Sequence, residues 1–100
     1  MNEQVTLISV SSSGNSFDRK ETEIRNTVFC TEKNVGQKEF YEAEARGLKS
    51  EYQLEVWAQD YNGEKRAEYG TDEENKPKPY KIYRTFKKGD KFELYLASEG

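Results

Sequence analysis

The chain is 100 residues long, which is the length of a single domain. Hydrophobic residues make up only 33% of it and charged residues 35%, so the core must be thin and must draw on the seven Tyr, five Phe and one Trp side chains, each of which buries a large area. The formal net charge of −3 argues against a protein whose main task is to follow a nucleic-acid backbone, because such domains are usually basic.

The N-terminal third is predicted to form two strands joined by a loop. Residues 5–10 are a short apolar stretch typical of a strand. The segment 11–19 is rich in Ser, Gly and Asn and predicts a mobile loop. Residues 21–31 carry many β-branched side chains, which favours a long strand with one wet face. The side chains expected on its buried face are Ile24, Val28 and Cys30.

The hydrophobic period changes after residue 36 and predicts one short α-helix, roughly at residues 37–48. Tyr41, Ala45 and Leu48 are spaced i, i+4, i+7, which gives a one-sided apolar stripe. Gly47 suits the C-terminus of this helix. We expect the stripe to face the core.

Strand signals return in the second half of the chain. Residues 52–58 alternate between apolar and polar side chains, which is the clearest half-buried strand in the sequence. The Asn-Gly pair within residues 60–63 predicts a tight turn, and residues 66–69 begin a return strand. The polar segment 70–79, with two prolines, predicts a protruding mobile loop.

The C-terminal part reads as a hairpin. Residues 80–86 and 92–97 alternate in the manner of strands, and residues 87–90 form the turn between them. On the first strand, the alternate side chains expected to pack in the core are Tyr80, Ile82 and Phe86.

These elements predict a mostly-β fold in a single domain over residues 1–100. We expect a small antiparallel β-barrel or sandwich of about six strands, with one short α-helix, because a sheet of this size curls to limit its free edges.

The compartment can be inferred from the cysteine count and the hydrophobic runs. A single cysteine excludes an intrachain disulfide, which a small secreted domain would often use. The first residues lack the basic and apolar regions of a signal peptide, and no run approaches the length of a membrane span. We therefore expect a protein made in the cytoplasm with no membrane partner.

The sequence offers little chemistry. Histidine is absent, which removes the commonest general base and metal ligand and excludes a Ser-His or Cys-His pair. Cys30 is expected to be a buried structural cysteine. Asp72, Glu73 and Glu74 fit no calcium-loop spacing and are expected to form a solvated acidic loop. We predict that the chain is not an enzyme and holds no metal or cofactor.

One segment supports an alternative function. Between residues 76 and 91, seven Lys and Arg residues are interleaved with Tyr80, Tyr83 and Phe86. Cations and stacking rings are the means by which single-strand nucleic-acid binders work. The alternative hypothesis is therefore a small single-strand nucleic-acid-binding β-barrel; the competing interpretation is a structural hairpin with its basic face in water.

Trp57 has the opposite parity to Leu54 and Val56 in the predicted strand and is expected to face outward. An exposed Trp on a strand often marks an interface hot spot. The alternative is that the barrel or the helix covers it.

The order of segments resembles the phage head–tail joining family of adaptor and stopper connector proteins. The resemblance lies in five segments spread over most of the chain: Val5-Thr6-Leu7-Ile8; Glu39-Phe40-Tyr41-Glu42-Ala43 with Gly47-Leu48-Lys49; Asp60-Tyr61-Asn62-Gly63; Tyr80-Lys81-Ile82-Tyr83-Arg84; and Phe92-Glu93-Leu94-Tyr95-Leu96. Their order and spacing and the total length together carry it.

The resemblance implies a structural role at the head–tail interface of a virion. In such proteins a small β-barrel forms a ring of about a dozen copies below the portal, and the ring joins the DNA-filled head to the tail. The implied partners are copies of the chain itself, portal or adaptor proteins, tail proteins and passing double-stranded DNA that is not bound specifically. The residues expected at interfaces are Ser12, Ser13, Asn15, Phe17, Trp57, Asp72, Glu73, Glu74 and Lys76.

Overall fold

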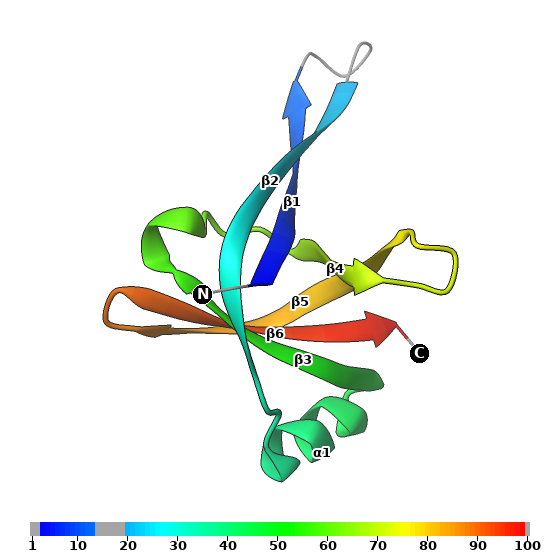
Figure 1. Ribbon diagram of the computed structural model, residues 1–100, viewed down its shortest axis with the longest axis vertical. Coiled ribbons are helices and arrows are strands. Elements are labelled where there is room, and N and C mark those ends of the chain that lie inside the picture. Colours follow the sequence, from blue (N-terminus) through cyan, green and yellow to red (C-terminus); the bar gives the residue numbers. More distant parts are fainter. Residues whose placement is uncertain (1–2, 14–19, 100) are drawn as a thin grey trace.

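The protein is described here by a computed structural model that covers residues 3–13 and 20–99. Its six antiparallel strands follow each other around a closed barrel in the order β1-β2-β3-β6-β5-β4 (Figure 1). The elements are β1 (Glu3–Ser13), β2 (Lys20–Lys33), α1 (Gln37–Ala45), β3 (Leu48–Trp57), the 3-10 helix η1 (Ala58–Asp60), β4 (Arg66–Thr71), β5 (Pro77–Lys88) and β6 (Lys91–Glu99). The mostly-β fold with about six strands and one short α-helix is confirmed, and its sheet is a barrel.

The strand pairs around this barrel differ greatly in length. β1 and β2 form eleven residue pairs, and β3 and β6 form nine. By contrast, β2 meets β3 only where residues 31–33 pair with residues 53–55, and β1 meets β4 only where residues 6–8 pair with residues 66–68. The barrel is therefore closed by two short contacts on either side of the long β1–β2 hairpin.

The β1–β2 hairpin projects beyond the barrel. From Ser9 onward on β1, and from Lys20 to Ile24 on β2, the two strands pair only with each other in the part of the chain that the structure describes. We call these two segments the arm; Figure 1 shows it at one end of the molecule and α1 at the other. The Cα radius of gyration, 14.6 Å, exceeds the value of about 13 Å for a compact 100-residue domain.

The arm changes two sequence expectations. Ser11–Ser13 belong to β1 and are not part of a loop; the rest of the expected loop, with Asn15 and Phe17, lies outside the described residues. Ile24 is 51% exposed although its parity predicted a core position, because the arm extends past the point where other strands could cover it.

The core fills the barrel and is lined by all six strands. Its fully buried side chains include Leu7, Leu54, Leu94, Leu96, Val5, Val56 and Cys30, so the buried position of Cys30 is confirmed. Aromatic rings extend this cluster: Tyr52 makes edge-on contacts with Tyr69 and Tyr80, with ring centroids 5.0 and 5.5 Å apart. The thin aliphatic core is thus completed by tyrosines, as the composition indicated.

Helix α1 is shorter than expected and turns a different face to the sheet. It ends at Ala45, and Gly47, with a φ of +75°, leads directly into β3 at Leu48. Ala43 is its one buried residue, whereas Tyr41 is 64% exposed. The expected apolar stripe was wrong because Glu39, which lies on the same face as Ala43, anchors the helix to β5 by accepting from the Tyr83 hydroxyl and pairing with Arg84.

The first half of β5 keeps the predicted alternation and the second half does not. Tyr80 and Ile82 are buried, but the register shifts between Ile82 and Arg84. This β-bulge changes the parity of the strand, so Phe86 points outward and is 51% exposed. The prediction of Phe86 in the core was therefore wrong.

The protruding loop of residues 70–79 is also shorter than predicted. β4 continues to Thr71 and β5 begins at Pro77, and these two residues pair. Only residues 72–76 connect the strands.

No helix in the described ranges has both the length and the apolar character of a membrane span.

The core assignment predicts a large difference between two truncations. Leu94→Ala should lower the free energy of unfolding by about 2–5 kcal/mol, because Leu94 is completely buried and the substitution leaves a cavity. Val10→Ala, at a residue that is 52% exposed in the arm, should change it by less than about 0.5 kcal/mol. Urea titration followed by Trp fluorescence measures both. Equal effects would contradict the assignment of the arm as external to the core.

Candidate functional site

The loop of residues 72–76 is a tightly hydrogen-bonded acidic turn. Asp72 Oδ1 accepts hydrogen bonds from the backbone N–H groups of Glu74 and Lys76, at 2.9 and 3.0 Å. Asn75 adopts a left-handed conformation with a φ of +63°, and its N–H donates to the backbone oxygen of Asp72 at 3.0 Å. Because these bonds fix the backbone, the loop holds the exposed Glu73 and Glu74 side chains away from the barrel.

Two of the three acidic side chains of this loop form contacts within it. Glu74 pairs with Lys76 at 3.3 Å, and Asp72 Oδ1 accepts from the backbone N–H groups of Glu74 and Lys76. Among the described residues, no group of three or more Cys, Asp or Glu side chains stands together in a way that could hold a metal ion. What the loop presents is negative charge.

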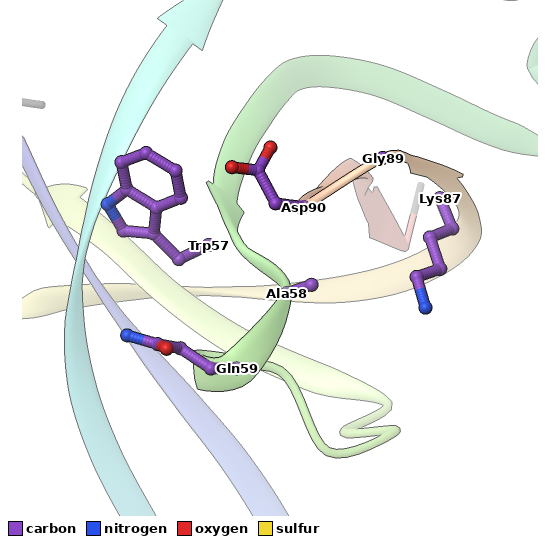
Figure 2. Close-up of a pocket in the computed structure, with 6 residues that line it drawn as sticks. All are labelled: Trp57, Ala58, Gln59, Lys87, Gly89 and Asp90. Carbon is purple, nitrogen blue, oxygen red and sulfur yellow. The ribbon is translucent and has the colours of Figure 1, made fainter.

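Trp57 lies at the opposite end of β5 from the acidic loop. It is the last residue of β3, it is 40% exposed, and Lys91 Nζ lies 5.1 Å from the centroid of its ring. Trp57 borders an open groove of about 600 Å³ whose other lining residues are Ala58, Gln59, Lys87, Gly89 and Asp90. Figure 2 shows Trp57 and Lys87 on either side of the groove, with Asp90 between them.

The residues expected at interfaces that the structure describes are therefore not gathered into one site. Ser12 and Ser13 pair through their backbone with Glu21 and Lys20 near the end of the arm. The acidic loop is at one end of β5, and Trp57 is beside the turn at the other end. The structure places the described ones on three separate surfaces.

Sequence reasoning missed most of the exposed apolar surface. Apart from Trp57, six large apolar side chains are exposed, three of them on β1 and β2 and three on α1 and β5. They are Val10, Ile24, Phe29, Phe40, Tyr41 and Phe86. Phe29 shares the wet parity of β2, so alternation could have found it; Ile24 and Phe86 could not be found in this way, because an overhang and a bulge decide their exposure.

The basic hairpin uses most of its aromatic rings internally. Tyr80 is 4% exposed. The Tyr83 hydroxyl donates to Glu39 Oε1 and lies 2.9 Å from Ser50 Oγ, and burial raises the pKa of Tyr83 to about 12. Of the three rings singled out in the sequence, only Phe86 is free to stack on a base. A single-strand nucleic-acid binder stacks successive bases on several rings, and of these three rings the hairpin offers Phe86 alone.

A charge network covers the seam between β2 and β3. Lys33 Nζ lies 2.8 Å from Glu55 Oε2, and this hydrogen bond raises the pKa of Lys33 and holds the pKa of Glu55 below its ordinary value. Glu93, which is 5% exposed, accepts a hydrogen bond from Gln53 Nε2 at 2.6 Å and pairs with Lys88 at 3.3 Å. These contacts join β2, β3, β5 and β6.

Cys30 is unsuited to nucleophilic chemistry. Burial, with smaller contributions from the carboxylates of Glu3 and Glu32, raises its pKa from 9.0 to about 12. A reactive cysteine needs the opposite, a cationic neighbour that favours the thiolate.

Comparison of the chain with models of known protein families, with curated proteins and with solved structures finds no match.

The burial of Cys30 predicts a protected thiol. At pH 8, native protein should react with a thiol reagent such as dithionitrobenzoate on the order of a hundredfold more slowly than protein unfolded in urea. The comparison is made by absorbance at equal reagent concentration. A native rate close to the unfolded rate would show that the barrel opens readily near Cys30.

The Lys33–Glu55 contact predicts a pH dependence. The folded-state pKa of Glu55 is lowered, so its contribution to stability is present above the ordinary Glu pKa and is lost as the pH falls through the lowered value. Glu55→Gln should thus be less stable than wild type at neutral pH, and the difference should vanish in acid. Urea midpoints across this range measure it. Glu44→Gln, at an exposed position on α1, is the control and should show no such convergence.

Proposed function

We propose that the chain is a structural head–tail connector of a tailed phage, an adaptor or stopper whose copies form a ring between the portal of the DNA-filled head and the tail. The order of segments that resembles such proteins supports this, as does a fold of the expected type. The observation that carries the proposal is the distribution of exposed apolar side chains over the arm, α1 and the outer wall of β5.

A ring subunit needs such a surface. It must contact two neighbours through different faces and must also meet proteins above and below, so its contact residues are dispersed and do not converge on a pocket. The described residues fit that need: the acidic loop, the Trp57 groove and the arm are well separated. Exposed apolar side chains scattered singly are ordinary, so it is their number that supports partners: seven large ones are exposed on a chain of 100 residues.

The charge of the chain suits a channel that lets DNA pass. A ring around DNA should not hold the phosphates tightly, since such contacts slow movement along the channel. A net charge of −3 and the exposed Glu73 and Glu74 side chains meet this condition. We assign the acidic loop to contact with the channel, the neighbours or the tail.

The proposal predicts saturable binding to heads. Purified protein should co-sediment with nuclease-treated, DNA-filled, tailless heads of the phage that carries it, and should saturate at roughly one ring of about a dozen copies per head. Quantitative gel densitometry gives the ratio. The absence of binding by folded protein would overturn the connector role.

A loop variant refines this test. Glu73→Ala/Glu74→Ala keeps the Asp72 and Asn75 hydrogen bonds, so it should fold and bind heads normally but lower the yield of tailed particles roughly tenfold. Glu44→Ala removes an exposed charge outside the loop and is the control. Normal tail joining by the loop variant would remove the loop from the interface.

A further inference from the structure

Two strands of the barrel each keep one edge unpaired in the described part of the chain. β2 pairs with β1 along residues 20–30, but β3 meets β2 only from Thr31 onward. β5 pairs with β6 along residues 84–88, whereas β4 pairs with β5 no further than Lys81. All side chains at residues 21–27 and 84–88 are exposed, and each edge borders a groove, between Ile24 and Asn62 on β2 and between Lys87 and Ala58 on β5. Unpaired edges of this kind are templates for another strand.

The two free edges lie on opposite sides of the barrel. In the order β1-β2-β3-β6-β5-β4, two strands separate β2 from β5 in either direction around the closed sheet. A contact between different faces of identical subunits is heterologous and propagates from copy to copy, closing into a ring when the rotation allows. Two edges on opposite sides of one chain are placed as such a contact requires.

The edges are also chemically complementary. Each has a large apolar side chain that is 51% exposed, Ile24 on β2 and Phe86 on β5. Glu23 precedes Ile24 and pairs with Arg25 within the chain, and Lys87 follows Phe86. If Ile24 lies beside Phe86 in an antiparallel pair, Glu23 lies beside Lys87; a parallel pair would place Arg25 beside Lys87 instead. Opposite charges across a pair stabilise it and like charges oppose it, so the antiparallel arrangement is favoured.

We propose that the free edge of β2 pairs in antiparallel fashion with the free edge of β5 of a second copy, placing Ile24 beside Phe86 and Glu23 beside Lys87. The main-chain hydrogen bonds supply the contact and the side chains set its register. This rests on the proposed function in one respect, since it identifies the pairing as the contact between neighbours in the ring. The pairing itself needs only two copies of the chain.

Chemical cross-linking tests the pairing directly. The native thiol of Cys30 is buried and does not interfere. Ile24→Cys/Phe86→Cys, treated with a short bismaleimide, should give a ladder of covalent dimers, trimers and higher species, both in concentrated solution and on heads. Each single variant should remain a monomer on a denaturing gel. Both positions are half exposed, so the substitutions should leave the fold intact, which circular dichroism checks.

A second pair of cysteines is the control and tests for a contact through α1. Ile24→Cys/Tyr41→Cys places the second thiol on α1, at a residue that is 64% exposed but on neither free edge. This pair should give no ladder. A ladder from it, dimers from Ile24→Cys alone, or no ladder from Ile24→Cys/Phe86→Cys in either preparation would overturn the proposal.

Charge reversal provides the second measurement, in the Ile24→Cys/Phe86→Cys background. Glu23→Lys and Lys87→Glu should each reduce the ladder about fivefold, and combining them should restore it, because the reversed charges again attract. Failure of the combination to restore the ladder would contradict the register.

The outcomes separate the two proposals. A ladder in solution from protein that does not bind heads would support the pairing and overturn the connector role. Saturable binding to heads without a ladder would support the connector role and overturn the pairing.

Discussion

The barrel closes between β2 and β3 through three residue pairs, and the projecting arm of the molecule follows from that short seam. Three pairs provide few main-chain hydrogen bonds, and the seam is reinforced from outside by Lys33 and Glu55 and from inside by Leu54. Since β2 turns into the seam only at Thr31, the rest of the strand runs free, with β1 alone beside it. The arm, the open edge and the exposed Ile24 are consequences of where that pairing begins.

The position of α1 shows polar contacts overriding a weak hydrophobic pattern. Nine residues make too short a helix to be stable by propensity alone, so tertiary contacts decide how it lies. Glu39 reaches both Tyr83 and Arg84 of β5, and Ala43 fits against the sheet because it is small. Turning Tyr41 inward would bury more apolar area but would break these bonds. The helix therefore leaves Phe40 and Tyr41 on its outer side, where a partner can cover them.

The sequence predicted the fold where a strand has neighbours along its length and failed where it does not. Alternation located Leu54 and Val56 in the core because β3 pairs with β6 along nine residues, so parity and burial coincide. For Ile24 the parity is correct but there is no barrel to bury it, and for Phe86 a bulge reverses the parity. Neither a strand's overhang nor a bulge has a local signal here, since both depend on which partner strands end nearby.

The same limit applies to the candidate site. The Asp, Asn and Pro residues of the sequence predict the turn formed by residues 72–76. The strand parity of Trp57 predicts that it faces outward. The edges of β2 and β5 are a property of topology: they exist because β3 and β4 pair elsewhere. No window of sequence contains that information, which explains why the apolar surface is largely unforeseen.

A long free edge exposes a protein to indiscriminate pairing, and the way this chain limits that hazard bears on its function. Proline or a covering loop would block the edge altogether. The β2 edge instead carries Glu21, Glu23 and Arg25, and the β5 edge carries Arg84, Lys87 and Lys88. Some of these charges are already paired within the chain, as Glu23 is with Arg25 and Lys88 is with Glu93. The remaining charges repel a copy that arrives in the wrong orientation but admit one whose signs match. An edge protected in this selective way is suited to assembly, because it keeps the strand available for one partner while discouraging the others.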